Sequence, residues 1–355
     1  MASTKAPVVF IHGLWLHASS WAAWQELFAG AGYESSAPGW PGDGDTVQAT
    51  RGNPDSVANH GIDDVTNHYA SFIDGLPAQP ILIGHSFGGM IAEKLLGMDR
   101  GAAAIAIDAA QIKGVLQLPL SSLRATLPVF ANPANRHKAV SLTAKEFRYS
   151  FGNTLSEEES DALHERWTIP SPARPLFEAA TAAFSPHSPD RVDTANEDRG
   201  PLLLTMGGKD HTVPEAITKS TLKQYRHSAA VTDLVEFADR GHSLTIDSGW
   251  REVAEACLGW LNKQGLQAAG LSSSMSGRRG RAARLTCGQR RSACRRRVRP
   301  RRRTAQVPRR LAGIGKEDTP WSWIWRGAVP SSPAGARESA WPSSAGWRRL
   351  VRGSP

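Results

Sequence analysis

The chain has 355 residues, and its 42 lysines and arginines against 33 aspartates and glutamates give a formal net charge of +9. That average hides two opposite charges, because residues 271–355 hold 21 basic and three acidic residues (net +18) whereas residues 1–270 hold 21 basic and 30 acidic ones (net −9). The net charge therefore does not argue for a nucleic-acid-binding protein, and the first 270 residues have the size of one large domain that needs no disulfide or metal to fold.

Short apolar runs alternate with amphipathic stretches along the first part of the chain. Residues 7–12 are a β-branched apolar run too short for a helix, which predicts a buried strand. Residues 19–30 carry Trp21, Trp24 and Phe28 at helical spacing, which predicts an amphipathic helix. The same reasoning predicts strands at 33–37, 80–84, 102–108, 202–206 and 231–237, and helices at 62–76, 87–98, 214–225 and 250–261. This alternation indicates an α/β fold with a doubly wound, mostly parallel sheet.

The alternation stops between residues 111 and 185, where six prolines are scattered among helical pieces and no strand is predicted. An insertion of this length between two strands predicts a helical cap over the edge of the sheet, with a long structural crossover as the alternative. We therefore expect one domain over residues 1–265, with its cap at about 111–185, followed by a separate tail over residues 266–355.

The tail is rich in arginine and has almost no aliphatic pattern, so it is predicted to be disordered. One interpretation is an arm that binds phosphate backbones weakly, with Trp321, Trp323 and Trp325 available for stacking on bases. The other is a non-functional extension, because this composition is what GC-rich DNA gives when it is translated out of frame. The second interpretation is favoured, and nucleic acid is not expected as a partner.

A catalytic motif follows the strand at 80–84. Residues 84–89 read Gly-His-Ser-Phe-Gly-Gly and match G-x-S-x-G at a junction between a strand and a helix. The spacing suits a strained turn that lifts the Ser86 hydroxyl clear of the sheet, with small neighbours that let backbones pass closely. The helix N-terminus directs the Phe87 amide toward an oxyanion formed beside the serine. A glycine-rich turn with an incidental serine is the alternative.

A serine nucleophile needs a base within hydrogen-bond reach and an acid that orients the base. Asp210 lies just past the strand at 202–206, and His242 follows the strand at 231–237 through a short loop. The chain order Ser86, Asp210, His242 is the one expected for this architecture. Asp108 ends the strand at 102–108 and is the alternative acid.

These motifs resemble the α/β-hydrolases, in the cofactor-free group that includes esterases, lipases and perhydrolase-type haloperoxidases. The resemblance covers about residues 6–264 and rests on four motifs in order: Val-Phe-Ile-His-Gly at 9–13, the turn at 84–89, Gly-Lys-Asp at 208–210 and Gly-His at 241–242. It implies that Leu14, the residue after the glycine of the His-Gly turn, supplies the second amide of the oxyanion hole. It implies little about the substrate.

Several aromatic residues are candidates for lining a substrate pocket. Trp15 and His17 sit beside the His-Gly turn. Within the cap, Phe147, Phe151 and Trp167 are aromatic residues placed to roof an apolar acyl site, and the core of the cap itself is the alternative for each.

The sequence therefore predicts a serine hydrolase that cleaves a carboxylic ester or related acyl compound. Perhydrolysis, carbon–carbon bond hydrolysis and hydroxynitrile cleavage with the same triad are alternatives, and a non-catalytic ligand-binding or nucleic-acid-associated protein is an alternative of another class. No cofactor or metal is expected, because nucleotide-binding loops are lacking and Cys257, Cys287 and Cys294 lack metal-ligand spacing. Without a leader pattern or an 18-residue apolar run, a cytoplasmic protein with no membrane span is expected.

Overall fold

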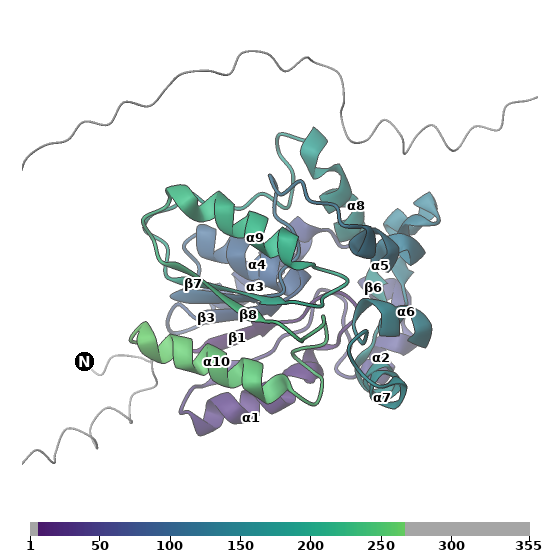
Figure 1. The fold of residues 1–355 in the computed structure, drawn as a ribbon, viewed down its shortest axis with the longest axis horizontal. Coiled ribbons are helices and arrows are strands. Elements are labelled where there is room, and N and C mark those ends of the chain that lie inside the picture. The colour runs from purple at the N-terminus through teal and green to yellow at the C-terminus, as the bar shows by residue number, and fades with distance from the viewer. Residues whose placement is uncertain (1–5, 267–355) are drawn as a thin grey trace, which may run out of the picture. The chain divides into compact units, whose positions relative to one another are not determined.

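A six-stranded parallel sheet forms the centre of the protein (Figure 1), described by a computed structural model for residues 6–266. Its strands lie in the order β2-β1-β3-β4-β7-β8, and every neighbouring pair is parallel. Their bounds are β1 Val8–Ile11, β2 Ser35–Ser36, β3 Ile81–His85, β4 Ala103–Ile107, β7 Leu202–Gly207 and β8 Thr232–Phe237. The prediction of a doubly wound parallel sheet is confirmed.

Helices cover both faces of the sheet (Figure 1). On one face lie α3 (Ile62–Asp74), α4 (Phe87–Gly97) and α9 (Glu215–Gln224), and on the other lie α1 (Ala22–Gly30) and α10 (Trp250–Lys263). Side chains of a strand alternate between the two layers, so Ile81 and Ile83 pack with α1 and α10 whereas Leu82 packs with α3 and α4. Burial on both faces explains why these strands are continuous apolar runs.

The predicted helices differ from the observed ones mainly at their ends. The helix predicted at 19–30 begins as a 3-10 turn, η1 (Ala18–Trp21), which His17 caps by accepting from the Ser19 amide. A short helix, α2 (Val47–Gly52), and a 3-10 turn, η2 (Pro54–Val57), were not predicted. Their surroundings are rich in glycine, proline and aspartate, which are typical of a loop.

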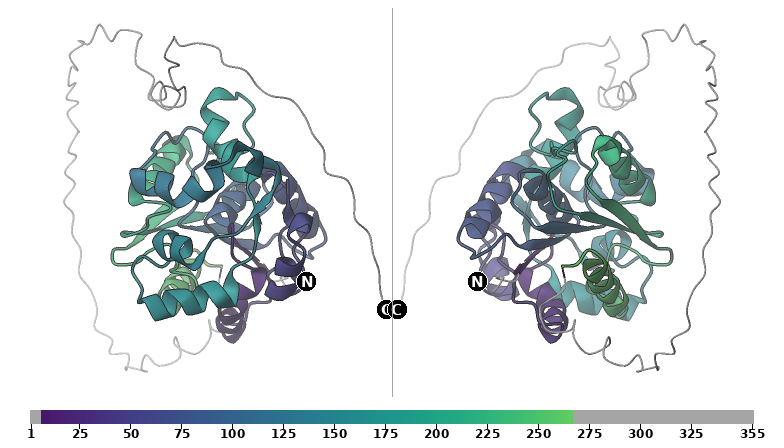
Figure 2. Two further views of the ribbon diagram at one scale, coloured as in Figure 1. Left: turned by 90° about the vertical axis from the view of Figure 1, so that its right-hand side faces the viewer. Right: turned by 90° about the vertical axis from the view of Figure 1, so that its left-hand side faces the viewer.

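The segment between β4 and β7 is the predicted helical cap, seen face-on in the left view of Figure 2. It contains α5 (Leu120–Phe130), η3 (Pro133–His137), α6 (Ala144–Ser150), α7 (Glu157–Trp167), α8 (Arg174–Thr181) and η4 (Ala182–Phe184). The expectation that this segment holds no strand is wrong, because β5 (Ala139–Val140) and β6 (Ser171–Pro172) pair antiparallel, with Val140 opposite Ser171. Strands of two residues are too short to leave a periodic pattern in a sequence.

The predicted arginine-rich tail at 266–355 lies outside the described residues except for Leu266, and the domain boundary at 265 stays a prediction. Between residues 6 and 266, no helix combines the length and the apolar character needed to cross a bilayer.

Candidate active site

The turn at Ser86 joins β3 to α4 in a strained conformation. Ser86 has φ +56°, in the left-handed region that residues other than glycine rarely adopt, and it is 5 % exposed. Glycine is required on both sides of it, because a Cβ at Gly84 would overlap the Gly88 carbonyl and a Cβ at Gly88 would overlap the Ile11 carbonyl. The strain and the close backbone packing are the features that a nucleophile elbow requires.

Asp210 and His242 form a hydrogen-bonded pair beyond the ends of β7 and β8. His242 Nδ1 donates to Asp210 Oδ2 at 2.6 Å, and neither side chain has solvent-exposed surface. The other carboxylate oxygen of Asp210 accepts from the amides of Thr212 (2.6 Å) and Val213 (2.8 Å). Burial acts to raise the pKa of Asp210, but His242 and these hydrogen bonds hold that pKa below its ordinary value. Asp210 is thus an anion that hydrogen-bond donors of the protein stabilise at a site without solvent exposure.

The second ring nitrogen of His242 is unsatisfied. Its Nε2 is buried and has no hydrogen-bond partner among the described residues, so Ser86 Oγ is not hydrogen-bonded to it. An unsatisfied buried polar atom costs about 1–3 kcal/mol. Catalytic hydrogen bonds are often long before a substrate binds. The arrangement leaves His242 Nε2 available to a hydroxyl proton.

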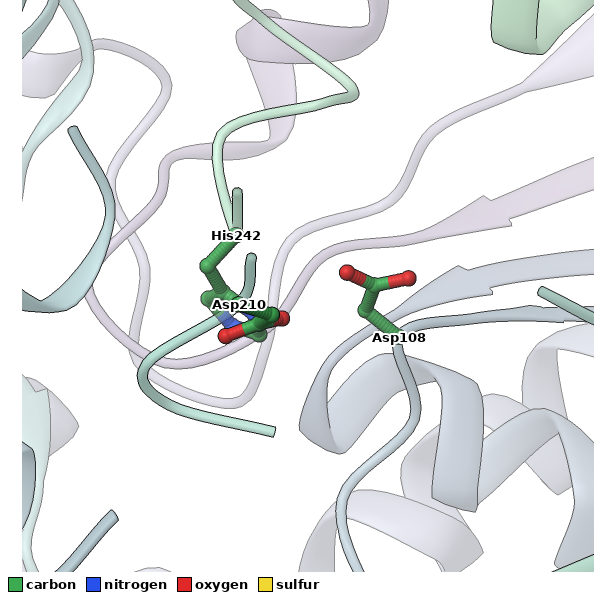
Figure 3. A group of neighbouring side chains, drawn as sticks. All are labelled: Asp108, Asp210 and His242. Atoms are coloured by element: carbon green, nitrogen blue, oxygen red, sulfur yellow. The ribbon is translucent and has the colours of Figure 1, made fainter. Parts of the chain in front are cut away.

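Asp108, the alternative acid, lies beside this pair at the end of β4 (Figure 3). One carboxyl oxygen of Asp108, one of Asp210 and a ring nitrogen of His242 all lie within 4.8 Å of one another. Both carboxyl oxygens of Asp108 accept from the Gly207 amide, at 3.0 and 3.2 Å. The His242 imidazole donates its hydrogen bond to Asp210 and not to Asp108, which favours Asp210 over Asp108 as the acid that orients the imidazole.

The same three side chains are the group of the described residues whose spacing could hold a metal ion. Within this group His242 Nδ1 already donates a hydrogen bond to Asp210 Oδ2 at 2.6 Å. A metal at this point would have to break that bond, so the contacts fit a proton-transfer site better than a metal centre. The expectation that the protein needs no metal stays a prediction.

The turn after β1 packs directly on the elbow. A Cβ at Gly13 would lie 2.8 Å from both the His85 carbonyl oxygen and Ser86 Cβ, so only glycine fits. The next residue, Leu14, donates no hydrogen bond from its amide within residues 6–266. Phe87 is the first residue of α4, where an amide has no partner inside the helix. Both predicted oxyanion-hole amides therefore lack a hydrogen-bond acceptor among the described residues, and their role stays a prediction.

Comparison with known proteins places this architecture in a family. The model of the alpha/beta hydrolase family matches residues 8–256. The chain belongs to this family. The resemblance inferred from the four motifs is thereby confirmed, and a search of curated proteins found no match.

Solved structures similar to this hydrolase share its fold at low sequence identity. A methylesterase from Arabidopsis is 18 % identical, with a TM-score of 0.51 and coverage of 73 % of this chain and 99 % of that one. A monoacylglycerol lipase from Paleococcus ferrophilus is 20 % identical, with a TM-score of 0.51 and coverage of 73 % and 96 %. An extracellular α/β-hydrolase from a Paenibacillus species is 20 % identical, with a TM-score of 0.53 and coverage of 72 % and 98 %.

Three of the predicted pocket residues of this hydrolase form an aromatic cluster that contacts His242 through Phe151. The Phe151 ring lies edge-on to the His242 imidazole, with centroids 4.8 Å apart, and Phe147 stacks on Phe151 at 4.9 Å. Trp15 meets Phe151 edge-to-face at 6.4 Å. All three side chains are buried, so they form an apolar wall beside His242.

The other two predicted pocket residues lie at the junction between the cap and the turn. Both ring nitrogens of His17 have partners, at the Ser19 hydroxyl (2.7 Å) and the Gly44 carbonyl (3.0 Å). Trp167 is half-buried beneath the Arg166 guanidinium, and its carbonyl accepts from the His17 amide at 3.0 Å. Within residues 6–266 neither side chain is hydrogen-bonded to Ser86, Asp210 or His242, and both residues join the cap to the turn.

Two residues near the triad have contacts that sequence reasoning did not find. His85 donates from Nε2 to the His242 carbonyl at 2.9 Å, and burial and the neighbouring His242 lower the pKa of His85 well below its ordinary value. A neutral His85 thus anchors the loop that carries His242. Ser171 of β6 accepts from the Trp15 amide at 2.6 Å. Nothing in the local sequence marks Ser171, because its role depends on the cap strand.

Proposed function

We propose that this hydrolase cleaves carboxylic esters through an acyl-enzyme formed on Ser86. The observation that carries the proposal is the fully buried Asp210–His242 pair with an unpartnered Nε2, together with a serine on a strained elbow. Pure ligand binding requires no such pair. Methylesterase and lipase activities among proteins of similar fold support an ester as the substrate.

The catalytic cycle follows from the positions of these groups. Ser86 Oγ attacks the ester carbonyl carbon while His242 Nε2 takes the hydroxyl proton. The amides of Leu14 and Phe87 donate to the oxyanion of the tetrahedral intermediate. The intermediate collapses, His242 returns the proton to the leaving alcohol, and a water molecule then repeats the sequence to release the acid. Asp210 holds the proton on His242 Nδ1 and stabilises the imidazolium.

The aromatic wall indicates which part of the substrate lies near the cap. Trp15, Phe147 and Phe151 are apolar side chains that exclude water from the base. We assign them to the acyl side of the pocket, with His17 and Trp167 as its outer support at the junction. A dry site strengthens the interaction of the oxyanion with its amide donors, because the local dielectric constant is low.

The test is covalent labelling of the full-length chain combined with ester turnover. A fluorophosphonate probe is expected to label Ser86, and p-nitrophenyl esters of increasing chain length are expected to be hydrolysed with a burst or steady rate that Ser86→Ala abolishes. Ser243→Ala is a matched control, because Ser243 is buried nearby but its hydroxyl donates to Asp247 at 3.0 Å. Retained turnover in Ser86→Ala, or labelling at another residue, contradicts the proposal.

A further inference from the structure

The catalytic site contains one carboxyl group more than a serine, histidine and aspartate triad uses. Asp108 and Asp210 lie on the loops after β4 and β7, which are neighbours in the sheet, and Figure 3 shows their side chains near His242. Asp108 is fully buried, as is the side chain of Asp210. Two carboxylates that share a dry site cannot both be ionised at modest cost, because like charges repel and burial removes their hydration.

The hydrogen-bond donors decide which of the two carries the negative charge. Asp210 receives three N–H groups, from Thr212, Val213 and His242, at 2.6 to 2.8 Å. Among the described residues Asp108 receives a single N–H, from Gly207, shared by its two oxygens at 3.0 and 3.2 Å. Donors stabilise the charged form of a carboxyl group, so the negative charge belongs on Asp210 and the extra proton on Asp108.

The charged and titratable groups around Asp108 do not supply an alternative counter-ion. His242 is already paired with Asp210. Arg240, on the loop after β8, acts to lower the pKa of Asp108, but its guanidinium is already paired with Asp247 and Glu252. His85, at the end of β3, uses Nε2 to donate to the His242 carbonyl and is held neutral by burial.

We propose that Asp108 is a neutral carboxylic acid in the resting enzyme and donates its proton to the Asp210 carboxylate, as a positioning residue for the triad. This inference rests on the proposed function. Burial and the adjacent Asp210 raise the pKa of Asp108 well above its ordinary value, whereas the pKa of Asp210 is lowered, in agreement with the donor count. The hydrogen bond between the two carboxyl groups fixes the orientation of Asp210 toward His242.

The first test measures the protonation of Asp108 without any substrate. The infrared difference spectrum of wild type minus Asp108→Asn at neutral pH is expected to contain the C=O stretching band of a protonated carboxylic acid. Asn suits the site because it is neutral, can donate to Asp210 and tolerates the φ of +43° at this position. A difference spectrum with only carboxylate bands overturns the proposal. This readout is independent of ester turnover, so it is unaffected if the proposed function fails.

The second test is the pH dependence of kcat/KM for a p-nitrophenyl ester. If Asp108 is neutral, Asp108→Asn removes no charge, so it is expected to leave the apparent pKa of the acid limb in place and to keep most of kcat. If Asp108 is ionised, the same change removes an anion close to the Asp210–His242 pair and lowers that apparent pKa by about one unit or more. Such a shift overturns the proposal.

Two further variants separate positioning from general packing. Asp108→Ala removes the donor to Asp210 and is expected to lower kcat about tenfold or more with little change in KM, and recovery of activity in Asp108→Asn identifies the hydrogen bond as the cause. Equal losses in the two variants contradict the proposal.

Glu93→Gln is the matched control, because Glu93 is another buried carboxyl group, with a pKa raised by burial to about 8. Glu93→Gln is expected to remove a different C=O stretching band from the infrared spectrum and to leave the acid limb of the pH profile of kcat/KM unchanged.

Discussion

The backbone amide of Trp15 donates a 2.6 Å hydrogen bond to the hydroxyl of Ser171, which joins the turn beside the nucleophile to the cap. The Trp15 indole donates to the Val140 carbonyl at 3.0 Å, and the Trp15 carbonyl accepts from the Ile169 amide at 3.0 Å. Trp15 itself has φ +66°, an unfavourable conformation for a tryptophan. The two-stranded sheet β5–β6 therefore holds a strained residue next to Leu14, the proposed oxyanion donor.

Ser171→Ala is expected to lower kcat by about tenfold with a small effect on KM. Without the Ser171 hydroxyl the Trp15 amide loses its acceptor, so the strained turn relaxes and the neighbouring Leu14 amide shifts. Complete loss of one oxyanion donor typically lowers the rate about a hundredfold or more, and a shifted donor costs less. Steady-state kinetics with a p-nitrophenyl ester measure the effect. Ser156→Ala is the control, since Ser156 also lies in the cap but caps α7, and its loss costs about 1 kcal/mol of stability without touching the turn. Equal kcat values in the two variants would show that the turn does not depend on Ser171.

Asp210→Asn is expected to lower kcat by about 10⁴, the loss measured for this change in another serine hydrolase triad. An amide cannot hold the imidazole proton on Nδ1, so His242 is left with the wrong tautomer for accepting the serine proton. Ester turnover of the purified variant measures the loss, and fluorophosphonate labelling is expected to slow in parallel. A loss below tenfold would mean that another residue, with Asp108 the nearest, orients His242.

Phe151→Leu is expected to change the preference for acyl chain length. The ring of Phe151 covers His242 edge-on, and a smaller side chain enlarges the apolar space beside the base. The ratio of kcat/KM between butyrate and octanoate esters should move toward the longer chain. Phe177→Leu is the matched control, because Phe177 packs on Phe130 within the cap at 5.0 Å, and its ratio should stay at the wild-type value. The same shift in both variants would assign the effect to cap stability instead.

Glu93→Gln is expected to make the free energy of unfolding fall less steeply as pH rises. Glu93 lies in α4, where one carboxyl oxygen accepts from the Tyr225 hydroxyl at 2.7 Å and the other has no hydrogen-bond partner within residues 6–266. Burial raises the pKa of Glu93 to about 8 from an ordinary value of 4.5. The folded state binds this proton more tightly than the unfolded state. The contribution of Glu93 to the free energy of unfolding therefore decreases as pH rises from 4.5 to 8, by up to about 1.4 kcal/mol per pH unit.

Urea denaturation at several pH values measures this effect. The difference in unfolding free energy between Glu93→Gln and wild type should grow with pH across that interval and level off above it. Glu146→Gln is a control on an exposed carboxylate that caps α6. A constant difference between the Glu93 variant and wild type at all pH values would show that Glu93 is already ionised at acidic pH.

The parts of the fold that were predicted correctly are those with a local cause. β3 and β4 are buried on both faces and therefore read as apolar runs, and the elbow at Ser86 needs glycines at set positions. Asp210 and His242 were singled out because each lies a few residues past the end of a predicted strand, and the structure brings them together as a hydrogen-bonded pair. Whether they act on Ser86 rests on the proposed chemistry.

Other contacts depend on which strands are neighbours, and a linear sequence does not state this. Asp108 was considered a substitute for Asp210, whereas the adjacency of β4 and β7 makes the two carboxyl groups partners. Ser171 and Val140 meet Trp15 only because two short cap segments pair with each other. The roles of such residues can be assigned only from tertiary contacts, because the periodicity of the sequence does not indicate which strands are neighbours.

The adjacency of β4 and β7 has a consequence for how the enzyme folds. The hydrogen bond from Gly207 to Asp108 joins residues 99 positions apart, and the whole cap lies between them. Closing a loop of that length is slow compared with forming the helices on either side of it. The catalytic groups therefore assemble late, and after dilution from denaturant the recovery of esterase activity should lag behind the recovery of helical circular dichroism.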